Sequence, residues 1–299
     1  MSKTLLIDLN SWGHAANHGA ALSANGIQTQ AVFGVINGIT DAKGKFPNHE
    51  ILALWDSKAQ FRFDIYPEYK GTRSDTPEKI ESRAHYDAQK PFIKRALESL
   101  GINQMTAEGY EADDLAGHFV ASLSKNPANE IVLASGDQDW LQLVRPNLLW
   151  YDKRDDSRRV TIDNFQDYTG CLTPYQFLES KALQGDTSDN IKGVGGIGAK
   201  GAPEFLAEFG TVLKFWNKVD SGEYIPTRKP YIKLASDEGR GIFKRNFRLM
   251  NLLSVKPPSK SQVNLSRGKF DIEKFMDVCA ELSFVSMLNK IEMYREVFG

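Results

Sequence analysis

The chain has 299 residues, of which 41% are hydrophobic and 25% charged, and its formal net charge is −1 at pH 7. This composition is typical of a globular protein long enough for two domains, and the lack of an 18-residue apolar run argues against export or membrane insertion. Its two cysteines, Cys171 and Cys279, are far apart in the sequence, which favours free thiols in a reducing cytoplasm over a cysteine zinc site.

Short apolar runs alternate with amphipathic helical stretches through about residue 152, which predicts a parallel sheet covered by helices. The expected strands are Leu5–Leu9, Ile51–Trp55, Asn103–Met105, Ile131–Ala134 and Leu148–Tyr151. The expected helices are Thr29–Lys43, Pro77–Leu100, Ala112–Ser124 and Asp137–Leu143. We expect Pro91 to bend or divide the second of these helices.

Strand signals fade after Thr173-Pro174, where an N-cap precedes a proline at the first helical position. We therefore place a boundary near residue 170. This predicts an α/β domain over residues 1–170 and a helical domain over residues 171–299. Beyond a loop at Val255–Ser259, the C-terminal residues have the pattern of amphipathic helices and carry no recognisable chemical motif.

Nine acidic residues lie where a predicted strand ends, where the next helix begins, or in a loop further along the chain. They are Asp8, Asp56, Glu111, Asp113, Asp114, Asp137, Asp139, Asp186 and Asp189. In a parallel α/β sheet, ligands collect at the carboxyl ends of the strands. Acids from separate segments can therefore converge on one cleft.

A single acid after a strand is more often a turn former or an N-cap than a ligand. A whole set of acids at corresponding ends of successive elements is harder to explain in this way, because like charges at close range raise one another's pKa values. Oxygen ligands without His or Cys favour Mg²⁺ or Mn²⁺, and two such ions can activate water and stabilise the leaving oxygen of a phosphodiester. With these acids neutralised by metal, the rest of the chain is basic enough to attract nucleic acid.

A glycine-rich stretch follows the last two acids. Its candidate DNA-binding residues are Lys192, Gly193, Gly195, Gly196, Gly198 and Lys200. The stretch matches the G-x-G-x-x-G dinucleotide pattern, but the residues before it have the pattern of a helix end and an acidic loop rather than a strand, and Ala199 breaks the P-loop pattern. A hairpin between two short helices fits better, because glycines allow positive φ and close approach of a DNA strand. The alternative is a plain glycine-rich connection between helices.

The segment from Phe61 to Arg73 interleaves aromatic and basic residues just beyond Asp56. Such a segment can stack on exposed bases and pair with phosphate. Aromatic residues in a loop of this kind are more often part of a small satellite core, so the pattern by itself is a weak signal.

Four motifs resemble, in the same order, those of the 5′-nuclease family. They are Pro67–Arg73, Glu111–Asp114, Ser135–Asp139 and Gly185–Lys200. This family includes flap endonucleases, the 5′→3′ exonuclease domains of bacterial DNA polymerases, and free-standing bacteriophage members of similar length. The resemblance spans roughly residues 3–210 and implies a PIN-like nuclease domain, a helical arch within residues 74–100 and a helix-hairpin-helix DNA-binding motif. The first motif, Asp8-Leu9-Asn10, departs from the many relatives that have a small residue after the aspartate.

The resemblance also implies residue roles. The first metal ion would be held by Asp8, Asp56, Glu111 and Asp113. The second ion, or its outer shell, would involve Asp114, Asp137, Asp139, Asp186 and Asp189. Lys70 and Arg73 would be the catalytic residues that contact the scissile phosphate, and Tyr69 would stack on the terminal base. The hairpin would hold the duplex strand, with a monovalent cation such as K⁺ beside it.

We therefore expect a nuclease that uses Mg²⁺, with Mn²⁺ as a substitute, to cleave DNA at 5′ flaps and duplex 5′ ends during replication or repair in a bacterial or phage-infected cell. No membrane partner is expected. One alternative is a ribonuclease-H-like enzyme that removes RNA primers from RNA–DNA hybrids. A second is a non-catalytic DNA-binding module whose acids hold structural metal.

Overall fold

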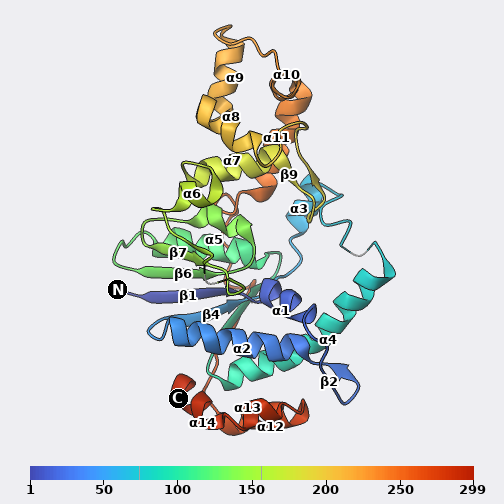
Figure 1. Ribbon diagram of the computed structural model, residues 1–299, viewed down its shortest axis with the longest axis vertical. Helices are drawn as coiled ribbons and strands as arrows, with labels where there is room; N and C mark the ends of the chain where they lie inside the picture. The colour runs from blue at the N-terminus through green and yellow to red at the C-terminus, as the bar shows by residue number, and fades with distance from the viewer. Residues whose placement is uncertain (74, 156) are drawn as a thin grey trace.

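The computed structural model describes residues 1–73, 75–155 and 157–299, and a seven-stranded sheet lies at its centre (Figure 1). The strand order is β11-β5-β4-β1-β6-β7-β8. The central strands, which are parallel, are β1 (Lys3–Asp8), β4 (Glu50–Leu54), β5 (Asn103–Ala107), β6 (Glu130–Ala134) and β7 (Leu148–Tyr151). The edge strands, which are antiparallel to their neighbours, are β8 (Arg159–Val160) and β11 (Val263–Ser266). The predicted parallel sheet is therefore confirmed.

The expected strands are the five parallel ones, and each end lies within two residues of its expected position. Their apolar runs have a direct cause, because helices cover both faces of the sheet and leave neither side of a strand in water. In the central strand, Leu5 and Ile7 join the core on one face, while Leu6 joins the core on the other. The two edge strands escaped prediction because they are short and only partly buried.

Two layers of helices sandwich the sheet. One face is covered by α1 (Leu9–Asn17), α2 (Gln30–Lys45), α4 (Pro77–Ser99), α12 (Ile272–Glu281), α13 (Val285–Leu288) and α14 (Ile291–Phe298). The other is covered by α5 (Ala112–Leu123), the 3₁₀ helix η1 (Gln138–Leu143), α6 (Phe165–Thr169) and the start of α7 (Pro174–Gln184). The shorter elements are the hairpin of β2 (Ser23–Ala24) and β3 (Ile27–Gln28), and helix α3 (Gln60–Ile65).

The helix expected within the predicted arch forms as α4, which remains one helix through Pro91. The expected division of this helix is therefore wrong. Proline at this position removes one backbone donor, but the helix continues because its buried face packs on α2 and α12 around Ile93 and Leu97. The first residue of the predicted arch, Ser74, lies outside the described residues.

A group of helices forms the upper part of the molecule in Figure 1. It comprises α7, α8 (Gly201–Phe209), α9 (Val212–Asp220), α10 (Lys229–Ala235) and α11 (Asp237–Met250). These helices have a core of their own in which aromatic rings meet edge to face. Between α7 and α8, the strands β9 (Gly185–Asp186) and β10 (Ile191–Lys192) pair antiparallel and lead into the glycine-rich loop.

The C-terminal segment does not pack with this helical group. Strand β11 pairs with β5, and α12 and α14 place Phe275 and Tyr294 in the core beneath the sheet, at the opposite end of the molecule in Figure 1. The predicted helical unit over residues 171–299 is therefore not one packing unit. An amphipathic helix can cover either part of the molecule, so its sequence pattern does not indicate which surface it covers. Within the described residues, no helix is both long and apolar enough to cross a bilayer.

Candidate metal and nucleic-acid site

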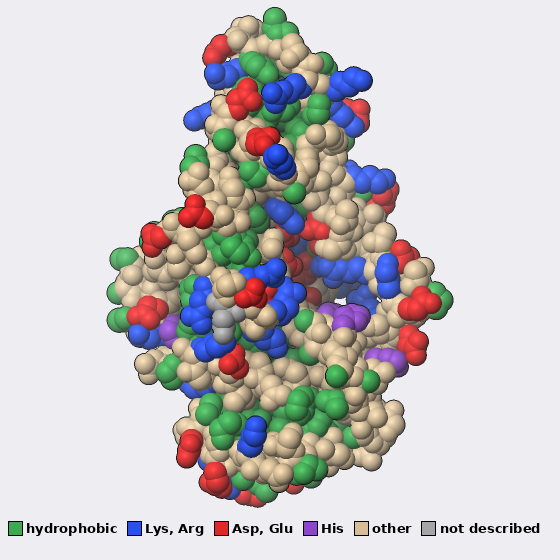
Figure 2. Space-filling model, in the orientation of Figure 1, with side chains coloured by type: hydrophobic (Ala, Val, Ile, Leu, Met, Phe, Trp, Pro, Cys, Tyr) green, Lys and Arg blue, Asp and Glu red, His purple; other side chains and the backbone are tan. Residues whose placement is uncertain are grey.

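The topology brings most of the predicted acids to one edge of the sheet. Asp8 ends β1, Asp56 follows β4, and Asp137 follows β6, three neighbouring parallel strands whose carboxyl ends meet at this edge. Helix α5 begins there with Glu111 as its N-cap residue. Figure 2 shows acidic side chains in a hollow between the helical group and the sheet, flanked by Lys and Arg.

Asp8 is buried and held by two hydrogen bonds. Its Oδ1 accepts from the Ser11 backbone N–H at 2.9 Å, and its Oδ2 accepts from the Ser135 hydroxyl at 2.7 Å. Burial, followed by the charge of Asp56, raises the pKa of Asp8 to about 6. The carboxylate is thus rigidly placed in a position where its negative charge is disfavoured.

Asp113 and Asp137 share this environment. Asp113 accepts a hydrogen bond from the Trp140 indole at 2.6 Å, and burial together with Asp137 and Asp8 raises its pKa well above the usual value. Burial and the charge of Asp139 raise the pKa of Asp137 to about 8. These carboxylates crowd one another in a way that a bound cation would relieve.

Glu111 contacts the aromatic and basic loop that follows α3. Its Oε1 accepts from Lys70 Nζ at 2.6 Å, and its Oε2 accepts from the Tyr69 hydroxyl at 2.9 Å. Burial alone would lower the pKa of Lys70, but Glu111 and Asp189 raise it above its usual value. Lys70 therefore stays protonated beside the acids.

The structure argues against the stacking role predicted for Tyr69. Its side chain is only 3% exposed, and it packs edge to face on Phe63 with ring centroids 5.5 Å apart. No ring face is left for a base. The aromatic residues of this loop instead form the small satellite core that was the alternative interpretation, together with Leu178 and Leu249.

Asp114 is fully buried, and both of its oxygens are already used. Arg62 donates to them at 2.8 and 2.7 Å, and Asp114 Oδ2 also accepts from the Glu111 backbone N–H at 2.9 Å. Full burial and the paired Arg62 argue against a direct ligand role for Asp114 and leave an outer-shell position next to Glu111. Arg62 was not predicted as a site residue, because an arginine among aromatic residues in the sequence gives no sign of being buried.

Asp139 and Asp186 are joined by a second residue that the sequence did not indicate. Lys181 Nζ lies 3.0 Å from Asp139 Oδ1 and 2.9 Å from Asp186 Oδ2. The Asp139 oxygen is buried and has no hydrogen bond of good geometry, although the lysine is close to it. Burial opposes ionisation of Asp186, but Lys181 and the Ser188 hydroxyl lower its pKa.

Asp189 connects the two loops on either side of the cleft. Its carboxylate pairs with Arg73, and its backbone carbonyl accepts from the Lys70 N–H at 2.9 Å. Asn190 also donates to the Glu68 carbonyl at 2.8 Å. Lys70 adopts a φ of 56°, a left-handed conformation that costs a non-glycine residue about 1–2 kcal/mol. Arg73 and Lys70 are thus placed beside the acids by the acidic loop itself.

The nine acids do not form one preformed metal site. Across residues 1–73, 75–155 and 157–299, no three His, Cys, Asp or Glu side chains are positioned to hold one metal ion together. The donor set nevertheless fits a divalent cation, because Asp8, Asp56, Asp113 and Asp137 lie close enough to repel one another and make no ion pair with any described Lys or Arg. All donors are hard oxygen atoms.

The glycine-rich loop divides into positions that need glycine for the fold and one that does not. A Cβ on Gly193 would lie 2.1 Å from the Gln184 carbonyl oxygen, and Gly195 and Gly196 have φ values of 98° and 77°. A Cβ on Gly198 would meet nothing within 4 Å. Lys192 and Lys200, which flank the loop, are both exposed.

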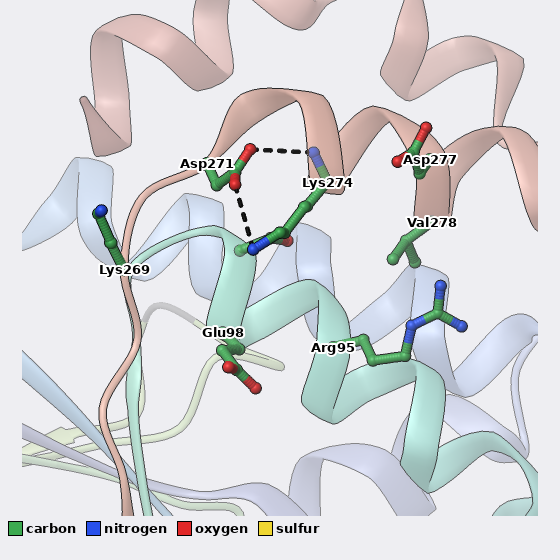
Figure 3. Close-up of a pocket in the computed structure, with 8 residues that line it drawn as sticks. Arg95, Glu98, Lys269, Asp271, Lys274, Asp277 and Val278 are labelled. Atoms are coloured by element: carbon green, nitrogen blue, oxygen red, sulfur yellow. Dashed lines mark hydrogen bonds and ion pairs between the residues drawn. The ribbon is translucent and has the colours of Figure 1, made fainter.

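Two pockets elsewhere on the molecule are lined by other residues. One of about 330 Å³ lies between α4 and α12 and is lined by charged residues that include Arg95, Glu98, Lys269, Asp271 and Lys274 (Figure 3). Its charges are mixed, and Asp271 is already paired with Lys274. This pocket offers remote positions for control substitutions.

Two family models match consecutive parts of the chain. The model described as 5′-3′ exonuclease, N-terminal resolvase-like domain, matches residues 3–170, and the one described as 5′-3′ exonuclease, C-terminal SAM fold, matches residues 172–252.

Known proteins are similar over nearly the whole chain. DNA polymerase I of Bacillus subtilis is 30% identical over 298 residues, 97% of this chain and 32% of the polymerase. The chain thus spans about a third of the length of that relative. The T5 5′-exonuclease with bound divalent metal ions (zinc) has a TM-score of 0.68 and 21% identity, covering 99% of this chain and 100% of that one. A bacteriophage T5 flap endonuclease complex with DNA and metal ions has a TM-score of 0.69 and 20% identity, covering 99% and 98%.

Proposed function

This chain belongs to the 5′-3′ exonuclease family and is a nuclease, and from that premise we propose that it cleaves DNA at 5′ flaps and duplex 5′ ends with the help of divalent metal ions. The reaction is hydrolysis of a phosphodiester by water, without a covalent enzyme intermediate. We propose Mg²⁺ as the natural ion and Mn²⁺ as a substitute, because the donors are carboxylate oxygens.

The observation that carries this proposal is the crowding of carboxylates at the carboxyl edge of the sheet. Asp8 is buried, Asp113 is half-buried and Asp137 lies at the exposed rim, and desolvation together with the neighbouring carboxylates raises the pKa values of all three. Such an arrangement is costly unless it serves a cation. The T5 5′-exonuclease, which has the same fold, binds divalent metal ions, and this similarity supports the proposal.

We assign the metal-facing positions to Asp8, Asp56, Asp113 and Asp137, with Glu111 beside them. Asp139, Asp186 and Asp189 differ from these four in having a basic side chain as a direct partner, which is Lys181 for the first two and Arg73 for the third. When bound, the ions would supply a hydroxide-like water and stabilise the charge on the leaving oxygen.

The protein's own residues would orient the substrate. Lys70 and Arg73 lie on the loop that Asp189 holds in place, and their charges can attract the phosphate on the scissile side of the strand. When phosphate replaces Glu111 as the partner of Lys70, the ammonium group keeps its proton, because the phosphate charge and Asp189 favour the protonated form as Glu111 does. These two residues therefore bind and position the strand and do not act as bases.

The glycine-rich loop is proposed to hold the backbone of the duplex whose 5′ strand is cut. Gly198 has no packing reason to lack a side chain, so its bare backbone is free for close approach to a phosphate. Lys192 and Lys200 add charge on either side, and a monovalent cation such as K⁺ would add further positive charge beside the loop. The division of the chain near residue 170 remains part of this proposal, with residues 1–170 as the nuclease part.

The experiment is cleavage of an end-labelled 5′-flap duplex in Mg²⁺, in Mn²⁺ and in chelator, with product length as the readout. We expect short 5′ products in both metals and none in chelator. Asp113→Asn should abolish cleavage while DNA binding in chelator persists, and Lys70→Ala should weaken both. Asp277→Asn, which changes an acid lining the remote pocket, should leave both unchanged. Cleavage by the Asp113 variant at the normal rate would refute the site assignment.

A second substrate and a binding measurement decide between the alternative functions. An RNA–DNA hybrid of the same sequence tests the ribonuclease-H-like function, which predicts faster cleavage of the hybrid than of the flap. Binding without turnover in any metal would instead indicate a non-catalytic DNA-binding module. A role in replication or repair follows only if the flap is preferred, because displaced strands are the 5′ structures that those processes generate.

A further inference from the structure

The loop between β7 and β8 carries two arginines that share one buried acid. Asp152 is fully buried and follows β7. Arg154 donates to it from Nε at 2.9 Å and from Nη2 at 2.7 Å, and Arg158 donates from Nη1 at 2.9 Å. The two side chains nevertheless remain 50% and 38% exposed, respectively. One buried carboxylate thus orients two guanidinium groups at the surface.

This arginine pair lies directly beside the acidic edge of the sheet. Arg154 Nη2 also donates to the carbonyl oxygen of Gly136, the residue before Asp137, at 3.0 Å. A Cβ on Gly136 would lie 2.8 Å from the same guanidinium, so the absence of a side chain there permits the approach. Figure 2 shows Lys and Arg side chains gathered on the front face just below the acidic hollow.

The loop is firmly anchored on its other side. Lys153 Nζ donates to the Gly34 carbonyl of α2 at 3.2 Å and lies 4.4 Å from the centre of the Trp12 ring. Asp155, the further acid that the structure describes in this loop, accepts from the backbone N–H and the hydroxyl of Ser157. The guanidinium groups are therefore held in place before any ligand arrives, so little side-chain entropy is lost on binding.

The position of this loop indicates which part of a substrate it can reach. The glycine-rich loop belongs to the helical group at the top of Figure 1, and the β7–β8 loop lies across the acidic edge from it, on the sheet. A flap substrate has two duplex arms that meet at the cut. If the glycine-rich loop holds the arm whose 5′ strand is cleaved, the arginine pair faces the other arm.

We propose that Arg154 and Arg158 bind backbone phosphates of this second duplex arm, so that the substrate is held on both sides of the scissile bond. Guanidinium groups present planar paired donors, which suit phosphate oxygens, and each arginine here keeps donors that Asp152 does not use. The inference depends on the proposed flap specificity. It concerns binding of one arm and not the chemistry of cleavage.

The test measures binding in chelator, so that it does not depend on cleavage. Two probes are compared: a nicked flap with both duplex arms, and the same DNA without the second arm. The variants are R154Q/R158Q and a version that adds D152N, which keeps the buried group neutral and protects the fold. The control is R95Q/R295Q, two similarly exposed, ion-paired arginines on α4 and α14. Thermal unfolding is recorded for every variant.

We expect the double variant to bind the two-armed probe several-fold more weakly than the wild type, and its salt slope on that probe to fall by about 1 per arginine. On the one-armed probe, variant and wild type should agree, and the control should match wild type on both. Equal weakening on both probes, or no weakening in a folded variant, would overturn the proposal. If wild-type protein binds both arms normally but never cleaves the flap, the proposed flap cleavage fails while this inference stands.

Discussion

The buried pair of Arg62 and Asp114 gives the sharpest test of how the acids are held. Arg62 is 2% exposed and Asp114 is fully buried, with two hydrogen bonds between them at 2.7 and 2.8 Å. Arg62 also donates to the Leu249 carbonyl at 3.2 Å. Arg62→Met leaves a buried, uncompensated carboxylate, so we expect a loss of about 3–5 kcal/mol in the free energy of unfolding. Urea denaturation at neutral pH, followed by fluorescence, measures this loss.

The double variant R62M/D114N makes the reasoning falsifiable. Because it removes both charges, its loss should be smaller than the sum of the two single losses by about 1–3 kcal/mol. The exposed pair of Arg95 and Glu281 is the matched control, and Arg95→Met should leave the free energy of unfolding within experimental error. A loss below about 1 kcal/mol for R62M, or strict additivity in the double variant, would show that the pair does not neutralise a buried charge.

Two further predictions concern the helical group. Gly193→Ala should lower the melting temperature strongly, because the new Cβ would lie 2.1 Å from the backbone oxygen of Gln184. Gly198→Ala should leave the melting temperature unchanged and weaken only DNA binding. Equal melting temperatures for the two variants would contradict this difference between the two glycines. Burial raises the pKa of Glu179 to about 7 in the folded protein, against 4.5 in the unfolded chain. Protonation of Glu179 therefore stabilises the folded protein at low pH, and this stabilisation is lost as the pH rises from 4.5 through 7. Glu179→Gln should therefore gain stability relative to wild type by about 3 kcal/mol between pH 4.5 and pH 8, in denaturation curves at both pH values, and a difference that does not change with pH contradicts the assignment.

The sheet was predictable because its signal is local. Strands buried on both faces need continuous apolar residues, and runs such as Ile131–Ala134 have no competing interpretation in an alternating α/β pattern. The placement of Asp8, Asp56 and Asp137 follows from the same fact, since each lies at the end of such a run or within three residues after it. The position of α12 and α14 was not predictable. Their amphipathic pattern specifies a buried face but not the surface that buries it.

The different roles of the individual acids could not be predicted from the sequence either. Asp113 and Asp114 are adjacent in one motif, yet the first faces other carboxylates and the second is neutralised by Arg62. Adjacent residues at the start of a helix point in different directions, so a run of acids cannot all face one site. The same limit applies to Tyr69, whose neighbours in space come from α7 and α11.

The lysines that pair with Glu111, Asp139 and Asp186 come from two segments that meet only in the folded protein. Lys70 belongs to the loop after α3, and Lys181 belongs to α7 of the helical group. The backbone bond from Lys70 to Asp189 and the small core around Leu178 join these segments across the cleft. Docking of the helical group onto the sheet thus brings Lys181 to Asp139 and Asp189 to Arg73, whereas the carboxylates of Asp8 and Asp113 crowd one another within the sheet and α5. Forming the complete site therefore requires both parts of the chain, although most of the acids come from one.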